Sequence, residues 1–404
     1  MKLHQSVFLF ALVSLLIISN ASYAAVLPEE RADGMYHSYD GGNITVSGPA
    51  VLVRKNVGNS VSVFYQHYID NITSASIDVE LGGSPYEEHR TENSVGVDYL
   101  NGKTTMNMSY TSSVENDYDA GTFSAGISQD FFGDLSTLSM GFSYGTDNVS
   151  ERTSNAPLTF TPASDITRQN YRIGFSQILT KNSTISFGFE TITDEAVSIN
   201  GIDTLNNPYR QYSYFSDPTP AAPNSGDEQR LFASEKYPST RTSNAASIRG
   251  NYFLDVFKSA IHYEYRWFQD SWGIKSNSIG VSYVQPIKNW ILDFRFRYYD
   301  QDQADFYRDM FDFADQFTFM GRDKELSAFT STSTGVSASY EFAKNGWGFI
   351  DKGSINLSYD KLVIEYENFR DARESVISGT AAPGEESLYE LNADVIQATL
   401  SIWY

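Results

Sequence analysis

Charged side chains at alternating positions within residues 243–300 are the part of this sequence best suited to chemistry. Successive side chains of a β-strand point to opposite faces, so this spacing places four guanidinium and two carboxylate groups on one shared face. Such a face can form a lattice of salt bridges, because unpaired charges in an interior are costly. It can also attract anions, because the cations outnumber the acids by two. The six residues are Arg249, Glu264, Arg266, Asp293, Arg295 and Arg297.

The turns that separate these segments predict which charges meet. A turn near 255–258 sets Arg249 directly opposite Glu264. Turns near 271–273 and 286–289 bring Arg295 to the level of Glu264, and Arg297 to the next level. A slip of one residue would move every side chain to the other face, so these levels depend on the alternation being correct.

Other residue patterns give weaker chemical signals. Residues 141–145 match the G-x-S-x-G pattern of a nucleophile elbow, but that motif needs a strand–turn–helix context and here it lies within an alternating segment. The histidines are not spaced as metal ligands. The chain has no cysteine, which excludes disulfides, thiolate metal sites and C-x-x-C-H haem attachment. We therefore predict no catalytic residue, no metal site, no cofactor and no enzymatic activity.

Apolar and polar residues alternate in paired segments from residue 44 to the end of the chain. Val95, Val97 and Tyr99, for example, alternate with polar residues before a short turn. Short turns also alternate with longer connections along the chain, as in bacterial outer-membrane β-barrels, which have short periplasmic turns and longer external loops. The short turns lie near 101–103, 131–134, 180–182, 255–258, 286–289 and 343–350, and the longest connections near 147–166, 194–242, 302–325 and 368–387.

This pattern predicts an all-β protein, a transmembrane antiparallel barrel of about 16 strands. Counting back from the C-terminus to the segment 91–101 gives 13 strands, and both chain ends should lie on one side, so the total should be even. The segments 44–55, 61–69 and 76–81 would supply the other three. A 14-strand barrel with an N-terminal segment inside the lumen is the alternative.

Small residues occupy the inward positions of the strands opposite the charged face. A lumen wall made of small side chains leaves room for water, for an inward-folded loop or for a docked partner protein. The set comprises Ser124, Gly126, Ser128, Ser139, Gly141, Ser143, Gly174, Ser176, Ser186 and Gly188.

An acidic run with interleaved aromatic residues occupies positions 300–317. Phe306, Met310, Phe313 and Phe317 recur at helical spacing, which predicts a helix in a solvated or lipopolysaccharide-facing loop. A calcium site and a loop folded into the barrel mouth are the alternatives, although the glycine of an EF-hand loop is missing.

The N-terminus predicts export. Lys2, an apolar run over 7–18 and the small-residue site Ser22-Tyr23-Ala24 have the order of a secretory signal peptide, with residues 1–24 removed and 25–404 forming the barrel. We therefore expect the protein in the Gram-negative outer membrane, in contact with lipid and lipopolysaccharide. The net charge of −21 argues against binding to nucleic acid.

The C-terminus ends in an alternating apolar stripe that closes on an aromatic residue. Such an ending is typical of outer-membrane barrels, and we expect the barrel-assembly machinery to recognise it. The predicted signal is Ile396, Leu400, Ile402 and Tyr404.

Several motifs resemble a known family, the bacterial domain-of-unknown-function family 3570. The resemblance covers nearly all of the chain after residue 38 and implies an outer-membrane barrel, but it brings no established activity or catalytic residue. The motifs include Gly48-Pro49-Ala50-Val51, Asp130-Phe131-Phe132-Gly133-Asp134, Arg322-Asp323-Lys324-Glu325-Leu326-Ser327, Gly346-Trp347-Gly348-Phe349-Ile350 and Ser401-Ile402-Trp403-Tyr404.

A barrel of this size encloses an aqueous channel. We therefore expect a passive or weakly selective pore for small solutes, gated by the connections at 194–242 and 302–325. The alternative is a non-conducting sheath or scaffold that holds a periplasmic or extracellular protein, for example a redox protein, against the small-residue wall.

Overall fold

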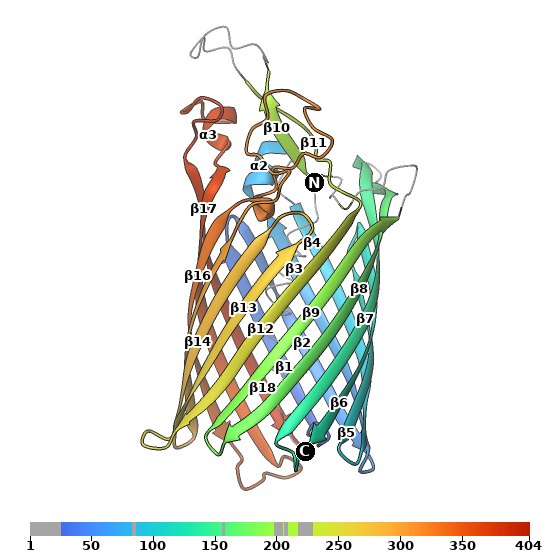
Figure 1. Ribbon diagram of the computed structural model, residues 1–404, viewed down its shortest axis with the longest axis vertical. Helices are drawn as coiled ribbons and strands as arrows, with labels where there is room; N and C mark the ends of the chain where they lie inside the picture. Colours follow the sequence, from blue (N-terminus) through green and yellow to red (C-terminus); the bar gives the residue numbers. More distant parts are fainter. Residues whose placement is uncertain (1–25, 83–85, 156–157, 198–204, 206–208, 217–228) are drawn as a thin grey trace.

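The strands of the chain close into one antiparallel barrel of 16 strands, seen from the side in Figure 1. This computed structural model describes residues 26–404 apart from 83–85, 156–157, 198–204, 206–208 and 217–228. The predicted fold and strand number are confirmed, whereas the predicted signal peptide lies outside the described residues. Each strand pairs with its neighbours in the chain, and the first pairs with the last, so the sheet has no free edge.

The barrel strands differ in length, and several extend beyond the membrane-spanning part. They are β1 (Arg31–Gly41), β2 (Ile44–Val57), β3 (Val61–Ser74), β4 (Tyr86–Asn101), β5 (Thr104–Val114), β6 (Tyr118–Phe131), β7 (Ser136–Asn155), β8 (Leu158–Thr180), β9 (Ser183–Val197), β12 (Thr240–Leu254), β13 (Ser259–Asp270), β14 (Lys275–Ile287), β15 (Trp290–Gln301), β16 (Phe329–Phe342), β17 (Lys352–Arg370) and β18 (Leu388–Trp403). A separate two-stranded sheet pairs β10 (Gln211–Phe215) with β11 (Arg230–Ser234).

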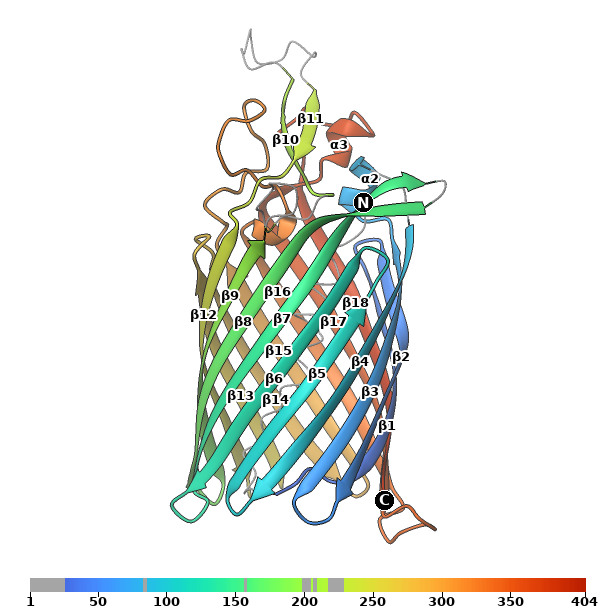
Figure 2. The ribbon, with the colours of Figure 1, turned by 90° about the vertical axis from the view of Figure 1, so that its right-hand side faces the viewer.

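The two ends of the barrel are built differently. One end, here called the turn end, carries the short connections and the C-terminus at the bottom of Figures 1 and 2. The other, the loop end, carries the β10–β11 sheet and the two short helices α2 (Ile77–Gly82) and α3 (Arg373–Val376). All six predicted short turns lie at the turn end. The shortest of them have two residues, as at 102–103, and the longest has nine, at 343–351.

Every second residue of a barrel strand faces outward, and most of these outward residues are apolar, so the outer wall of the barrel is apolar. On β5, Met106, Met108 and Tyr110 are exposed on this wall. On β13, Tyr263 and Tyr265 are exposed in the same way. Lipid cannot hydrogen-bond to a backbone, so a sheet is stable there only as a closed ladder of strands.

The N-terminal part of the strand prediction was partly wrong. The segment 76–81, expected to be a strand, forms α2, and the missing strand is β1. The outward positions of β1 include Gly34 and Ser38, so its alternation is too weak to detect. Ile77 and Val79 of α2 are buried over the barrel mouth. Because β1 belongs to the wall, the 14-strand alternative is also wrong.

The acidic segment does not form the expected helix. Between β15 and β16 the only helical residues are the 3₁₀ turn η1 (Lys324–Leu326), and the rest of 302–328 is irregular. Phe311 and Met320 are buried, so the segment folds onto the loop end. None of the described helices is long and apolar enough to cross a membrane.

The lipid and lumen faces of β5 should respond differently to charge. Met108→Arg should destabilise the barrel by about 2–4 kcal/mol, the cost of a cation near the bilayer midplane. Ser109→Arg should cost much less, because Ser109 pairs with Ser124, which lines the lumen cavity. Urea titration of the refolded barrel in liposomes measures the free energy of unfolding of both variants. Equal losses of stability in the two variants would contradict this assignment of faces.

Candidate functional site

The two arginines on β12 and β13 that face the lumen each form an ion pair. Arg249 donates two hydrogen bonds to Glu264, from Nε to Oε2 at 3.0 Å and from Nη2 to Oε1 at 3.3 Å. Nη2 of Arg266 lies 3.5 Å from Oε2 of Glu190 on β9. The bidentate pair is the stronger of the two, because both bonds are charge-assisted.

Arg295 on β15 is held by two carboxylates. Its guanidinium lies 3.1 Å from Asp293 and 2.8 Å from Asp360 on β17. Gly335 on the intervening β16 makes the second contact possible, because a Cβ atom there would lie 1.8 Å from Oδ1 of Asp360. Arg295 is therefore a brace across three strands.

Arg297 lies at a different level from the one expected. Gly280 pairs with Arg297, not with Arg295, so Arg297 is the residue level with Glu264. The error comes from the turn between β14 and β15, which has only two residues because Lys288 adopts a left-handed backbone with φ of 56°. Among the described residues Arg297 has no ion-pair partner.

The wall is electrically balanced once its neighbours are counted. The predicted inward face of residues 243–300 carries four arginines and two acids, but Glu190 and Asp360 come from strands outside that window. Four cations then face four carboxylates, so pairing rather than a bare basic strip is the dominant feature of this wall.

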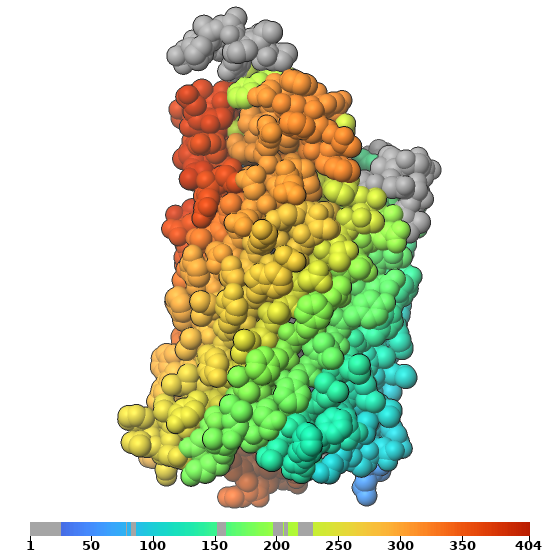
Figure 3. All heavy atoms as spheres, viewed as in Figure 1, coloured from blue at the N-terminus to red at the C-terminus, as the bar shows by residue number. Residues whose placement is uncertain are grey.

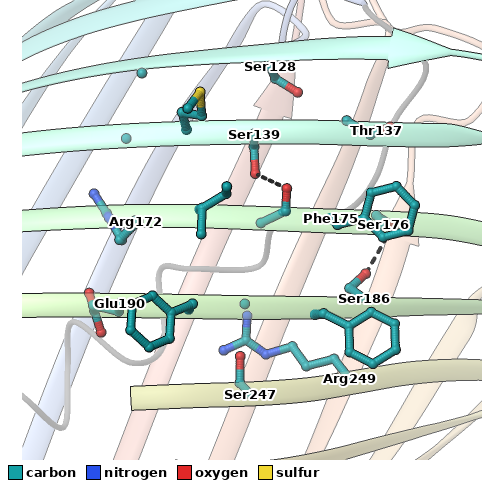
Figure 4. Close-up of a pocket in the computed structure, with 18 of the residues that line it drawn as sticks. Ser128, Thr137, Ser139, Arg172, Phe175, Ser176, Ser186, Glu190, Ser247 and Arg249 are labelled. Atoms are coloured by element: carbon teal, nitrogen blue, oxygen red, sulfur yellow. Dashed lines mark hydrogen bonds between the residues drawn. The ribbon is translucent and has the colours of Figure 1, made fainter. Parts of the chain in front are cut away.

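A cavity of about 350 Å³ lies between this wall and the strands β6–β9 (Figure 4). Arg249 and Arg266 line one side, and nine of the ten small residues named from the sequence line the rest; Ser143 is not among them. Arg172 and Glu190 also line the cavity. Sequence analysis missed both, although Tyr171, Ile173 and Phe189 face outward and the same alternation assigns them to the lumen.

A second inward cluster was also missed. Nε2 of His37 on β1 lies 2.7 Å from Oδ1 of Asp70 on β3. Asp70 also accepts a hydrogen bond from Nε of Arg90 at 2.8 Å. The His37 ring stacks on Tyr68 with centroids 4.6 Å apart. Across the described ranges, no three histidine or acidic side chains gather as metal ligands.

The long connections at the loop end form a compact structure, here called the cap, made of residues 209–216, 229–239, 302–328 and 371–387. In the space-filling view the orange atoms of 302–328 form a continuous mass above the strands (Figure 3). An apolar cluster joins the cap to the inward ends of the strands, and it contains Val149, Ile166, Tyr237, Trp272, Tyr307 and Leu326. A second cluster joins α2 to the ends of β16–β18, and it contains Ile77, Phe329, Leu362, Phe369 and Tyr389.

Buried ion pairs hold the cap loops together. The Arg230 and Glu386 side chains are fully buried, and Nη2 of Arg230 lies 2.9 Å from Oε2 of Glu386. The same nitrogen lies 3.1 Å from Oδ2 of Asp309. Arg322 lies 3.1 Å from Oδ1 of Asp309. Two arginines and two carboxylates from three loops thus form one neutral network.

Glu235 is a buried acid at the contact between two cap loops. Its Oε1 accepts a hydrogen bond from the backbone N–H of Arg322 at 2.6 Å, and its Oε2 accepts one from the Tyr237 hydroxyl. Burial, and then the charge of Asp323, raise the pKa of Glu235 to about 7. Arg210, 3.1 Å from Asp323, opposes this shift only partly.

The predicted C-terminal signal lies on β18, the strand that closes the barrel against β1. Ile396 and Leu400 are exposed on the outer face. The Tyr404 hydroxyl donates to the carbonyl oxygen of Arg54 at 3.2 Å, and Lys55 lies over the ring. Recognition of this strand by the assembly machinery stays a prediction.

Residues 40–350 match the family model described as "Protein of unknown function (DUF3570)". The chain belongs to this family. A search of curated proteins finds no match.

A comparison with solved structures finds several outer-membrane proteins at low similarity. A bacterial polysaccharide outer membrane secretin is 8% identical, with a TM-score of 0.46 over 95% of this chain and 99% of that one. The outer membrane protein opdK from Pseudomonas aeruginosa is 9% identical, with a TM-score of 0.41 over 92% and 99%. The CymD monoaromatic hydrocarbon channel is 9% identical, with a TM-score of 0.41 over 94% and 89%. At these levels the likeness concerns the fold alone.

Glu235 should make the cap less stable as the pH rises. The folded cap binds this proton more tightly than the unfolded loop does, so its stability falls between about pH 4.5, the ordinary pKa, and about pH 7. The loss is a few kcal/mol at most, since one pKa unit corresponds to about 1.4 kcal/mol. Hydrogen exchange of amides in 230–237 and 321–326, corrected for intrinsic rates, measures it at pH 5 and pH 8.

Glu235→Gln is the matched control. Its amide oxygen can still accept the Arg322 N–H, but it does not titrate. The variant should show the same protection at both pH values, and a pH dependence equal to that of the unchanged protein would assign the effect to another group.

Proposed function

We propose that this protein is a non-enzymatic outer-membrane pore for small polar solutes whose external entrance is controlled by the cap. In this proposal residues 1–24 are a cleaved signal peptide, the loop end is extracellular and the turn end is periplasmic. The observation that carries the proposal is the polar lumen cavity between a wall of small residues and a wall of charged ones. Such a lining serves no purpose in a solid barrel, but it suits hydrated solutes.

The pairing of the lumen charges predicts weak selectivity. Solutes would diffuse past Arg249, Arg266, Arg295 and Arg297, and three of these four are held by carboxylates 2.8–3.5 Å away. A paired arginine orients polar groups but attracts ions less than a bare one. Transport would therefore discriminate by size and polarity more than by charge.

The cap is proposed as the gate. Its apolar cluster packs against inward-facing residues at the ends of β7 and β8, and α2 packs in the same way against β16–β18, so the extracellular entrance is narrowed by folded protein rather than by open loops. The connections at the turn end are mostly two to four residues long, and chains that short cannot fold across the opening. Passage would then require the cap to move.

The second candidate is a sheath that holds a periplasmic or extracellular protein. The small-residue wall on β6–β9 favours it, because a surface without long side chains can accept a folded partner closely. A sheath needs no opening of the cap, whereas a pore does.

Single-channel recording of the refolded barrel in a planar bilayer tests the pore. We expect small or rare conductance steps, and larger or more frequent ones for Arg230→Met. This substitution keeps the bulk of the side chain but removes the arginine that pairs with the buried Glu386, and breaking a buried ion pair typically costs about 3–5 kcal/mol.

Arg308→Met is the control for this experiment. Arg308 lies on the cap segment 302–328, is exposed, and lies over the rings of Phe311 and Phe317. Its loss should leave conductance unchanged. If neither the unchanged protein nor Arg230→Met conducts, although both are folded, the pore is wrong and the sheath is favoured.

A further inference from the structure

Arg172 on β8 is a lumen cation without a partner among the described residues. It pairs in register with Gly141 on one side and with Glu190 on the other. Gly141 offers no side chain. Glu190 is already engaged, because it accepts a hydrogen bond from Asn170 at 2.8 Å and lies 3.5 Å from Arg266. The Arg172 side chain is exposed to the lumen.

The surroundings of Arg172 supply hydrogen-bond donors. Arg172, Arg249 and Arg266 line the same cavity, with Glu190 as the acid that lines it and Glu264 pairing with Arg249 from β13. Three cations and two carboxylates leave one positive charge, and Arg172 is the unpaired cation. The Ser247 hydroxyl lies in the same cavity, and Figure 4 shows Arg172 and Arg249 on the two strands that flank the strand of Glu190.

We propose that this cavity binds the oxyanion of a small solute, a carboxylate or phosphate group, with Arg172 as the residue that holds it. This inference deepens the proposed pore function and rests on it, since a solute reaches the site only through the lumen. A guanidinium presents two parallel N–H groups, a geometry that matches two oxygens of one anion. The Ser247 hydroxyl, which lines the same cavity, can donate to a remaining oxygen.

The cavity opens into the lumen. Its volume of about 350 Å³ gives room for a small organic acid or phosphate ester beside the guanidinium. Gly174, on the same strand as Arg172, and Gly188, on β9, keep the adjoining wall low, so that the anion can approach the guanidinium from the lumen.

Equilibrium binding tests the site without requiring conduction. Inorganic phosphate is titrated into the full-length barrel in detergent and followed by calorimetry, with acetate as a competing carboxylate. The Arg172→Gln variant should bind phosphate at least about tenfold more weakly, since a hydrogen bond to a charged group contributes about 1.5–3 kcal/mol. Arg172→Lys keeps the charge but not the two parallel N–H groups of the guanidinium, so it should lose less phosphate affinity than Arg172→Gln.

Arg295→Gln is the charge-matched control. It also removes one positive charge from the lumen, but Arg295 is already occupied by Asp293 and Asp360 and does not line this cavity. Its phosphate affinity should equal that of the unchanged protein. Equal binding by Arg172→Gln, or an equal loss in both variants, would overturn the proposal.

The same variants separate this inference from the pore itself. Phosphate binding that depends on Arg172, in a barrel that never conducts, would support the site and contradict the pore. Conductance with an anion preference that Arg172→Gln does not change would support the pore and contradict the site.

Discussion

The structure depends on one constraint: a backbone surrounded by lipid must satisfy all its hydrogen bonds within the protein. A sheet meets this requirement only by closing on itself, and here β1 closes it against β18. Closure fixes which residues face lipid and which face the lumen. Every charge on a strand must then go inward or to an end, and inside the barrel it must find a partner or water.

The balanced lumen wall follows from that constraint. Arg249, Arg266 and Arg295 each meet a carboxylate. Arg249 reaches the neighbouring strand, whereas Arg266 reaches Glu190 across β12 and Arg295 reaches Asp360 across β16. Arg172 differs because one of its neighbours is a glycine and the other is an acid with two other contacts.

The wall of the barrel could be predicted from the sequence because lipid imposes a period of two on most strands. The strand number, the short turns and the pairing of Arg249 with Glu264 follow from that period and from turn length. The prediction from this period failed for β1, because the outward positions of β1 are partly small or polar. The prediction also placed Arg295 two residues from its true level, because the turn at Lys288 is shortened by a left-handed backbone conformation that lysine rarely adopts.

The cap could not be predicted in the same way. Its residues have no period, because they pack as irregular loops against each other and not against lipid. The aromatic spacing in 306–317 looked helical, yet Phe311 is buried by a contact with Tyr212 from another loop. Contacts of this kind join positions about a hundred residues apart, which no local pattern reveals.

The ion pair between Arg230 and Glu386 constrains the order in which parts of the molecule can fold. The two residues are 156 positions apart, and Glu386 lies just before the last strand. Arg230 can reach this buried partner only when the last hairpin, β17–β18, is in place, so its guanidinium must stay hydrated until then. Contacts between such distant positions form late, because the entropy of closing the chain between them must first be overcome. The cap is thus completed together with the seam between β1 and β18, and a barrel that has not yet closed has no finished cap.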